Sequence, residues 1–172
     1  DPRLLRGQGQ FVDDNNLPGQ AYAVLVRSPH AHARIRSVNT APALAAPGVL
    51  AVYTGDDVAA DGLGTMKMSL PRKRPDGGPM FYRQHQGLSR GEVKYVGDPV
   101  ALVIAETLWQ AKDAAELVEI DYEPLPSVTD TLQLVQGKAA AVWQECPDNL
   151  SDRKSTRLNS SHVSESRMPS SA

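Results

Sequence analysis

The chain has 172 residues, of which 41% are hydrophobic and only 5% aromatic, and its formal net charge is -2. This length and apolar content predict one domain with a buried core, and the near-neutral charge gives no reason to expect a polyanionic partner such as nucleic acid. The single cysteine, Cys146, excludes an internal disulfide and every metal motif built from several cysteines.

The N-terminal residues show no secretion signal. Their sequence, DPRLLRGQGQFVDD, lacks a charged segment followed by an apolar one. No apolar run in the chain approaches the roughly 18 residues of a membrane span. We therefore predict a soluble protein of cytoplasmic type. Since the chain does not begin with methionine, we also expect residues to be missing before Asp1.

The first predicted elements are two strands. Residues 19–28 are apolar and β-branched in the middle, which predicts a buried strand. A turn-forming PHAHA segment follows, and residues 34–38 then alternate imperfectly between basic and apolar side chains. We expect these two strands to pair as a hairpin.

A short helix and a third strand come next. The helix is expected to begin near Asn39 or Thr40 and to stop at Pro47. Residues 49–54, VLAVYT, predict a strand, and the following Gly55-Asp56-Asp57 sequence predicts the turn that ends it.

The periodicity disappears between residues 59 and 91. This stretch is rich in proline, glycine and charge, and ordered loops of such length are uncommon and usually functional. It also carries too many apolar and aromatic side chains for a solvated linker, so we expect it to pack against something outside this chain. These side chains are Met66, Met68, Leu70, Met80, Phe81 and Tyr82.

Residues 97–126 hold the strongest pattern. A Gly97-Asp98-Pro99 turn leads into residues 100–105, an uninterrupted apolar strand of the type covered on both faces. Thr107 with Gln110 three residues later is a capping-box pattern that starts a helix. A strand with one wet face follows and ends at Pro124. The expected buried face of the helix consists of Leu108, Ala111, Ala115 and Val118.

The last patterned segment, TDTLQLVQG, predicts a short helix with Gly137 as its C-cap. Together the elements predict one α/β (α+β) domain over residues 1–151, with two strand–helix–strand units and a long intervening loop. Residues 152–172 have no apolar period, and seven of these 21 residues are serine. We expect them to form a disordered tail.

Three short motifs could bind a ligand, and each has a structural alternative. His30 and His32 lie two residues apart, a spacing that would face both toward one metal on a strand, but no third ligand is near and a hydrogen-bonded turn is the simpler interpretation. Gly7-Gln8-Gly9 lacks the third glycine and the preceding strand of a dinucleotide fingerprint. Arg72-Lys73-Arg74 could hold a phosphate or an acidic partner, or be solvated.

The remaining candidates favour structural roles. Asp13-Asp14 and Asp56-Asp57 are interpreted as turn chemistry at strand ends. Cys146 has no identifiable base or orienting group, as a nucleophile requires. Trp109 and Trp143 are interpreted as packing anchors. We therefore assign no catalytic, cofactor-binding or metal-binding residue from the sequence.

Three blocks of the sequence carry a family resemblance. They are GQFVDDNNLPGQAYAVLVRSPHAHARIRSV, APGVLAVYTGDDV and VKYVGDPVALVIAETLWQAKDAAELVEIDYEPLPSVTD. In this order and spacing they resemble the α/β hammerhead domain of the large, molybdenum-binding subunit in the xanthine dehydrogenase and aldehyde oxidase family. The loop LPRKRPDGGPMF is similar to the bacterial branch of aerobic carbon monoxide dehydrogenase large subunits.

The resemblance implies a molybdenum hydroxylase. Such enzymes bind a molybdopterin cofactor and insert a water-derived oxygen into an aldehyde or heterocycle, or oxidise carbon monoxide. Their electrons pass to iron–sulfur and FAD centres, commonly on an iron–sulfur small subunit and an FAD-binding medium subunit. The family's pterin-binding residues and catalytic glutamate lie in domains after the hammerhead, so none is carried over. The matched Gly97 and Pro29 are given structural roles, in the turn before the buried strand and in the bend between the hairpin strands.

The resemblance stops after CPDNL. One back-translation of DRKSTRLNSSH, residues 152–162, resembles the adapter oligonucleotide of short-read DNA sequencing, and SRMPSSA, residues 166–172, fits the downstream part of that adapter. We interpret residues 152–172 as a translated adapter and exclude them from fold reasoning. An ordinary serine-rich tail is the alternative.

Two functions remain open. The first is a truncated, inactive N-terminal fragment of a molybdenum hydroxylase large subunit, incomplete at both ends. The second is a stand-alone, non-catalytic scaffold domain of the same fold. The adapter-like tail favours the fragment.

Overall fold

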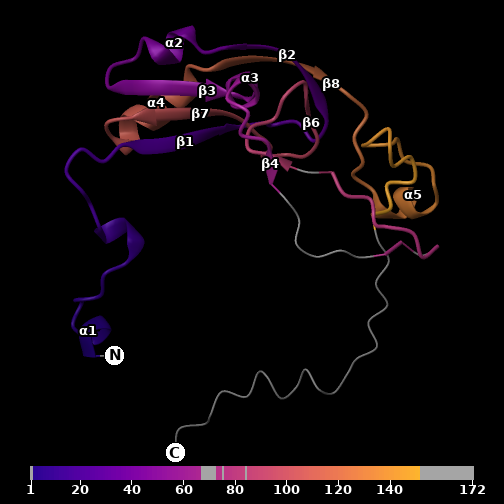
Figure 1. Cartoon of the computed structure of the whole chain (residues 1–172), viewed down its shortest axis with the longest axis horizontal. Helices are drawn as coiled ribbons and strands as arrows, with labels where there is room; N and C mark the ends of the chain where they lie inside the picture. The colour runs from indigo at the N-terminus through magenta and orange to yellow at the C-terminus, as the bar shows by residue number, and fades with distance from the viewer. Residues whose placement is uncertain (1, 67–72, 75, 84, 152–172) are drawn as a thin grey trace, which may run out of the picture.

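The computed structural model of the chain describes residues 2–66, 73–74, 76–83 and 85–151. It contains two three-stranded sheets, a two-stranded ribbon and several short helices (Figure 1). In chain order the elements are α1 (Pro2–Leu5), η1 (Val12–Asp14), β1 (Tyr22–Arg27), β2 (Ala33–Asn39), α2 (Ala41–Leu44), β3 (Val49–Thr54), α3 (Gly55–Ala60), β4 (Thr65–Met66), β5 (His85–Gln86), β6 (Glu92–Val93), β7 (Pro99–Ala105), α4 (Leu108–Glu116), β8 (Glu119–Pro124) and α5 (Thr131–Val135).

The strand pairing differs from the expected hairpin. One sheet has the order β1-β7-β3 and the other β6-β2-β8, and their strand pairs are antiparallel. The prediction that residues 19–28 pair with residues 34–38 is therefore wrong. Side-chain chemistry explains the choice: apolar β1 pairs with apolar β7, whereas Arg34 and Arg36 on β2 form ion pairs with Glu123 on β8.

The two predicted strand–helix–strand units, β2-α2-β3 and β7-α4-β8, are present, but each spans both sheets. β3 pairs with β7 and β2 pairs with β8, so the two units exchange strands. Helix length accounts for this, because the nine residues of α4 rise only about 14 Å while the seven residues of β7 extend about 23 Å. A helix this short does not return the chain to the start of the same sheet.

The main core lies between the β1-β7-β3 sheet and the helices α2 and α4. Ala101 and Val103 of β7 are fully buried against Ala43 and Ala114, and Val118 completes the cluster. Small alanines on the helices allow close helix-on-sheet packing. The predicted helix face is confirmed at Ala111 and Ala115, whereas Leu108 remains 39% exposed. Val118 is buried as predicted, but it lies beyond the end of α4 at Glu116.

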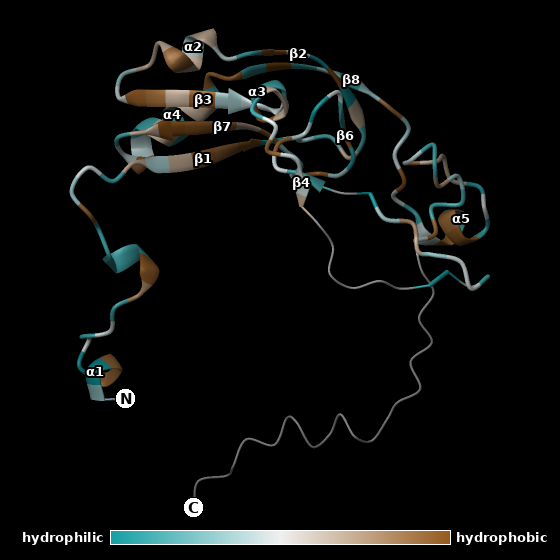
Figure 2. Ribbon diagram, viewed as in Figure 1, coloured by the Kyte–Doolittle hydropathy of each residue, from teal (hydrophilic) through white to brown (hydrophobic). Residues whose placement is uncertain are grey.

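The opposite face of the same sheet is only partly covered. Val100 is buried in a second cluster with Ala33 and Val93. Further along, Leu102 lies between its cross-strand neighbours Leu25 and Tyr53, which are 37% and 41% exposed. Figure 2 shows β7 as a continuous hydrophobic strand at the centre of this sheet. The prediction that β7 is covered on both faces therefore holds at one end only, within the part of the chain that the structure describes.

Helix α3 corrects the turn expected at Gly55-Asp56-Asp57. Asp57 Oδ2 accepts the backbone N–H of Thr54 at 2.7 Å, which is the return bond of a capping box, and it also accepts the Thr54 hydroxyl at 2.7 Å. This bonding to Thr54 lowers the pKa of Asp57. The acidic residues thus begin a helix rather than a plain turn.

An N-terminal arm, residues 2–20, extends away from the sheets (Figure 1). Its apolar side chains are largely exposed: Leu5 by 89%, Phe11 by 67%, Val12 by 87% and Leu17 by 74%. Asp14 lies in η1, not at a strand end, and its carboxylate accepts the Phe11 N–H at 2.9 Å. None of the helices among the described residues is long and apolar enough to cross a membrane.

Candidate functional site

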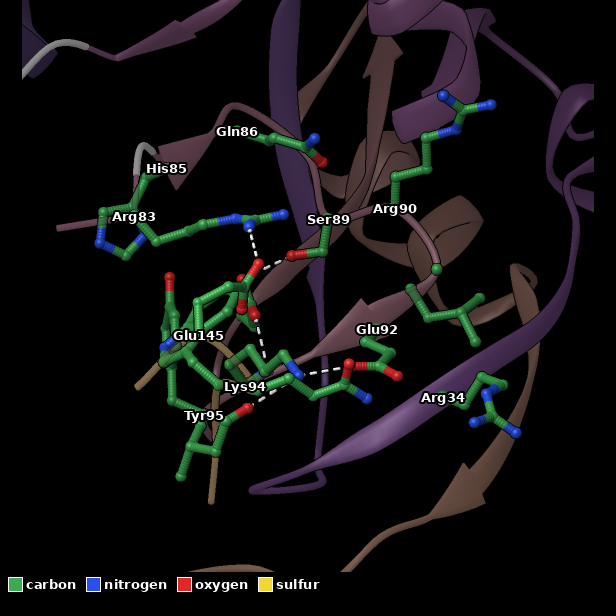
Figure 3. A pocket seen from close by; sticks show the side chains of 16 residues that line it. Arg34, Arg83, His85, Gln86, Ser89, Arg90, Glu92, Lys94, Tyr95 and Glu145 are labelled. Atoms are coloured by element: carbon green, nitrogen blue, oxygen red, sulfur yellow. Dashed lines mark hydrogen bonds and ion pairs between the residues drawn. The ribbon is translucent and has the colours of Figure 1, made fainter. Parts of the chain in front are cut away.

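A cavity of about 650 Å³ lies beside the β6-β2-β8 sheet. Its lining comes from three parts of the chain: residues 34–35 of β2, ten residues in the second part (83, 85, 86, 89–92, 94, 95 and 98), and residues 142–145. Figure 3 shows arginines at its rim, with Lys94 and Glu145 in the middle. The cavity is therefore assembled by the fold and has no local signature in the sequence.

Asp98 holds the part of the cavity wall that contains Ser89 and Lys94. Its side chain is only 7% exposed, and its carboxylate accepts the Ser89 hydroxyl at 2.6 Å and the Lys94 backbone N–H at 2.9 Å. Its carbonyl accepts the Ser28 N–H at 2.9 Å. A buried carboxylate with several donors holds the surrounding turns in one arrangement.

Lys94 is the most highly connected side chain of the site. Its ammonium forms an ion pair with Glu92, donates to the Val142 carbonyl at 3.0 Å and lies 3.1 Å from His32 Nε2. It also lies 4.9 Å from the ring centroid of Trp143, a cation–π distance. The hydrogen bond from Lys94 is the main cause that lowers the pKa of Glu92.

The arginines at the rim are all paired within the chain. Arg83 contacts Glu145 at 2.5 Å, Arg90 contacts Asp56 at 2.5 Å and Arg34 contacts Glu123 at 3.1 Å. These guanidinium groups are each more than half exposed. The arrangement is an ion-paired surface that joins segments of the chain that are distant in sequence.

One wall of the cavity belongs to a polar substructure that we call the C-terminal lobe, defined as the described part of residues 73–83 together with residues 140–151. The Phe81 N–H donates to the Ser151 carbonyl at 3.2 Å, and the Ser151 hydroxyl returns a bond of 2.7 Å to the Phe81 carbonyl. Phe81 also faces the ring of Trp143 at 6.3 Å. Phe81 therefore has contacts within the chain, whereas Met66 is 61% exposed, and the expected packing of this loop against an outside partner stays a prediction. Met68 and Leu70 lie outside the described residues.

The two histidines do not converge on a metal. His30 packs edge-on against Tyr122 with ring centroids 5.0 Å apart. His32 is 9% exposed, with Nδ1 2.8 Å from the Pro126 carbonyl and Nε2 toward Lys94. This geometry makes Nδ1–H the donor to Pro126. In the described part of the chain, no three His, Cys, Asp or Glu side chains are grouped to hold a metal ion.

The basic motif and the cysteine are brought together in the C-terminal lobe. Arg74 forms an ion pair with Asp148 and lies 3.8 Å from Cys146 Sγ. The thiol of Cys146 is 2% exposed and donates to Asp148 Oδ1 at 3.2 Å. Lys73 forms a β-bridge with Pro79, and Arg72 lies outside the described residues. The acidic partner of the motif is thus in this chain, at least for Arg74.

The tryptophans differ from each other. Trp143 is a packing anchor as predicted, because Phe81, Arg83 and Lys94 surround its ring. Trp109 is 71% exposed and carries only Lys112 over its ring at 4.9 Å, so its predicted anchor role is wrong.

The structural roles predicted for Gly97 and Pro29 are confirmed in part. Gly97 has φ +88° in the turn before β7, a conformation that favours glycine. Pro29 does lie between β1 and β2, but it bends the chain from one sheet to the other. Gly7 follows helix α1 rather than a strand, so the dinucleotide fingerprint is absent there.

Molybdopterin does not fit the described residues of this cavity. An anionic cofactor needs donors that are free to turn toward it, but these arginines and Lys94 already bind carboxylates of the chain. The one buried side-chain polar atom without a hydrogen-bond partner is the Tyr122 hydroxyl among the described residues, and Tyr122 does not line the cavity.

Known proteins are similar to this chain in sequence and in fold. Residues 6–126 match the family described as "Aldehyde oxidase and xanthine dehydrogenase, a/b hammerhead domain". The chain is 35% identical to the carbon monoxide dehydrogenase large chain of Afipia carboxidovorans over 95% of its own length and 19% of that protein. It is 36% identical to the nicotine 6-hydroxylase large subunit of Paenarthrobacter nicotinovorans over 89% of the chain and 18% of that protein.

Solved structures agree with these sequence relatives. A crystal structure of Cu,Mo-CO dehydrogenase matches 91% of the chain with a TM-score of 0.70 and 35% identity, covering 18% of that protein chain. Quinoline 2-oxidoreductase from Pseudomonas putida 86 matches 81% of the chain with a TM-score of 0.69 and 36% identity, covering 17% of its chain. The chain thus spans about a fifth of the length of these relatives. It belongs to the aldehyde oxidase and xanthine dehydrogenase family, in which it corresponds to the a/b hammerhead domain.

Proposed function

We propose that this chain is the hammerhead region of a molybdenum hydroxylase large subunit and that it supplies an assembly surface rather than the redox centre. In this proposal the complete subunit holds molybdopterin and oxidises a small substrate with oxygen derived from water. Electrons then pass to iron–sulfur and FAD centres on partner subunits. The family membership and the short span relative to the relatives support this assignment.

The partly open face of the β1-β7-β3 sheet is the observation that carries the assembly role. Leu25, Leu102 and Tyr53 form an apolar row across the three strands, and two of them are more than a third exposed. Exposed apolar rows of this kind favour burial against another surface. We infer that the remaining molybdopterin-binding part of the large subunit covers this row, and that the N-terminal arm packs with it.

The boundary between domain and tail stays a prediction. Residues 152–172 lie outside the described residues, so the structure neither supports nor contradicts the adapter interpretation. The cytoplasmic location also stays a prediction.

Recovery of the genomic reading frame around codons 1–151 tests the proposed function. We expect one frame several hundred codons longer, whose product, expressed with its neighbouring subunit genes, contains molybdenum and reduces a dye with carbon monoxide, an aldehyde or a heterocycle. A stop codon directly after codon 151, or an active product without molybdenum, would contradict the proposal.

A pair of variants of that product tests the assembly surface. Leu25→Asp places a charge on the proposed interface and is expected to lower the yield of assembled enzyme at least severalfold. Lys112→Asp, on the opposite helical layer, is the matched control and is expected to leave assembly unchanged. Equal yields for both variants would show that this sheet face is not covered by the rest of the enzyme.

A further inference from the structure

The contacts inside the C-terminal lobe and inside the two three-stranded sheets differ from the contacts that join the lobe to the sheets. Inside the lobe, Phe81 and Ser151 exchange two hydrogen bonds, and Arg83 binds Glu145 at 2.5 Å. Inside the sheets, strand ladders and buried alanine and valine side chains provide the contacts. The two parts therefore have separate internal supports.

Apart from the chain itself and a 3.1 Å hydrogen bond from the Tyr82 hydroxyl to the Met66 carbonyl of strand β4, one side chain among the described residues connects these parts. Among the described residues, the hydrogen bond and the ring contact that join the lobe to the sheets both involve the Lys94 ammonium. It donates to the Val142 carbonyl at 3.0 Å and lies 4.9 Å from the Trp143 ring. On the sheet side the same ammonium binds Glu92 and faces His32 Nε2 at 3.1 Å.

The base of Lys94 is fixed to the sheets. Its backbone N–H donates to the buried Asp98 at 2.9 Å, and the preceding Val93 is fully buried at the end of β6. Its side chain is only 15% exposed, so the ammonium is largely shielded from water. A shielded charge gains more from acceptors and from an aromatic face than an exposed charge does.

We propose that Lys94 is a latch whose positive charge holds the C-terminal lobe against the sheets and closes one side of the cavity. Neutralising this charge removes the bond to Val142 and the attraction to Trp143 together, while the sheet ladders remain intact. The lobe then opens, and the wall formed by residues 142–145 moves away from Arg34 and Glu92. This inference concerns the conformation of the chain and does not depend on the proposed enzyme function.

The chain offers a matched pair of lysines for the test. Lys94 and Lys112 each lie 4.9 Å from a tryptophan ring, but Lys112 contacts Trp109, which is 71% exposed on helix α4. We would compare Lys94→Met, Lys94→Arg and Lys112→Met in the full chain by amide hydrogen exchange. Quenching of Trp143 fluorescence by acrylamide, in a Trp109→Phe background, provides a second readout.

Lys94→Met is expected to speed exchange in residues 140–151 about tenfold, which corresponds to the loss of one hydrogen bond to a charged group. It should also raise the quenching of Trp143, while exchange in β7 stays at its wild-type rate. Lys94→Arg keeps the charge and should retain most of the protection, and Lys112→Met should change neither readout.

Three outcomes would overturn the latch. Unchanged exchange in residues 140–151 of Lys94→Met would show that the lobe is held by something else. An equal acceleration in β7 would show that Lys94 stabilises the whole domain and is not a latch. Failure of Lys94→Met to fold would contradict the proposal that the sheets are stable without this charge. Lys94→Arg is the control, because it keeps the charge and should fold whether or not Lys94 is a latch.

Discussion

The two three-stranded sheets with helices α2 and α4, which we call the sheet body, are stabilised mainly by apolar burial. The C-terminal lobe is stabilised mainly by polar contacts. The body buries small apolar side chains such as Val103 and Ala114 almost completely. The lobe depends on ion pairs and hydrogen bonds, including the half-buried pair of Arg74 with Asp148 and the more exposed pair of Arg83 with Glu145. Apolar burial gives cooperative stability that salt hardly affects, whereas exposed ion pairs contribute little and are screened by salt. We therefore expect the two regions to respond differently to mutation, salt and pH.

The largest effect should come from the core of the body. Val103→Ala removes two methyl groups from a fully buried position and is expected to lower the free energy of unfolding by about 2 kcal/mol. Leu25→Ala, on the neighbouring strand but 37% exposed, is the control and should cost less than about 1 kcal/mol. Urea denaturation of the full chain measures both. Equal losses would mean that the two faces of the sheet are equally buried in solution.

A second test concerns the start of α4 in the body. The Thr107 side chain accepts the Gln110 N–H at 3.3 Å, so Thr107→Ala should lower the free energy of unfolding by about 1 kcal/mol. Thr40, at the start of α2, makes no such side-chain bond and serves as the control. Thermal unfolding should show a clear shift for Thr107→Ala and almost none for Thr40→Ala. A similar shift in unfolding temperature for both variants would show that the Thr107 hydrogen bond does not stabilise the start of α4 specifically.

High salt should change the hydrogen-exchange rates of the C-terminal lobe and leave those of the sheet body unchanged. At 1 M ionic strength the screening length falls to about 3 Å, so exchange in residues 140–151 should quicken two- to threefold, roughly, while β7 is unaffected. Glu145→Gln removes the partner of Arg83 and should reduce this salt dependence. Hydrogen exchange measured in low and high salt provides the comparison. Salt-independent exchange throughout the lobe would show that its ion pairs contribute nothing measurable.

The smallest effect on the whole chain should come from Glu92. Its pKa is lowered from 4.5, first by the hydrogen bond from Lys94 and then by the charges of Lys94 and Arg34. The unfolded chain therefore binds this proton at a higher pH than the folded chain does. The stabilisation is complete above the unfolded pKa and is lost as the pH falls through the lower folded pKa.

Acid titration of residues 140–151 by hydrogen exchange, corrected for the intrinsic rate, tests this sign. Protection should fall as the pH drops below about 4.5, the ordinary glutamate value. Glu92→Gln should show a weaker acid dependence, and the remaining slope should come from carboxylates such as Asp148, whose pKa is also lowered. If the pH dependence of protection is unchanged in Glu92→Gln, Glu92 does not contribute to the acid sensitivity of residues 140–151.

The sequence predicted individual elements better than their arrangement. The residue pattern places β7, α4 and β8 nearly where they are found, because apolar period and capping residues act locally. It could not assign β1 to β7, because alternation indicates which face is buried and not which strand is adjacent. The turn predicted at Asp57 is the start of helix α3, because Thr54 three residues earlier serves as the N-cap and bonds to the Asp57 carboxylate.

The cavity could not be predicted from the sequence for a related reason. Lys94 binds Glu92 two residues away, but Val142 and Trp143 reach it only after the C-terminal segment folds back. Such contacts leave no fixed spacing in the sequence. Cys146 and Arg74 stand out in the sequence, but their contacts are made with Asp148, which is more than seventy residues from Arg74.

The central position of β7 has a consequence for synthesis on the ribosome. β1 and β3 both hydrogen-bond only to β7 among the described strands, and β2 gains its long partner only with β8. A nascent chain that stops before residue 99 therefore has no complete three-stranded sheet to fold into. Its early apolar strands, β1 and β3, must stay unpaired until β7 (Pro99–Ala105) emerges, and during this interval they are exposed to aggregation or to capture by a chaperone.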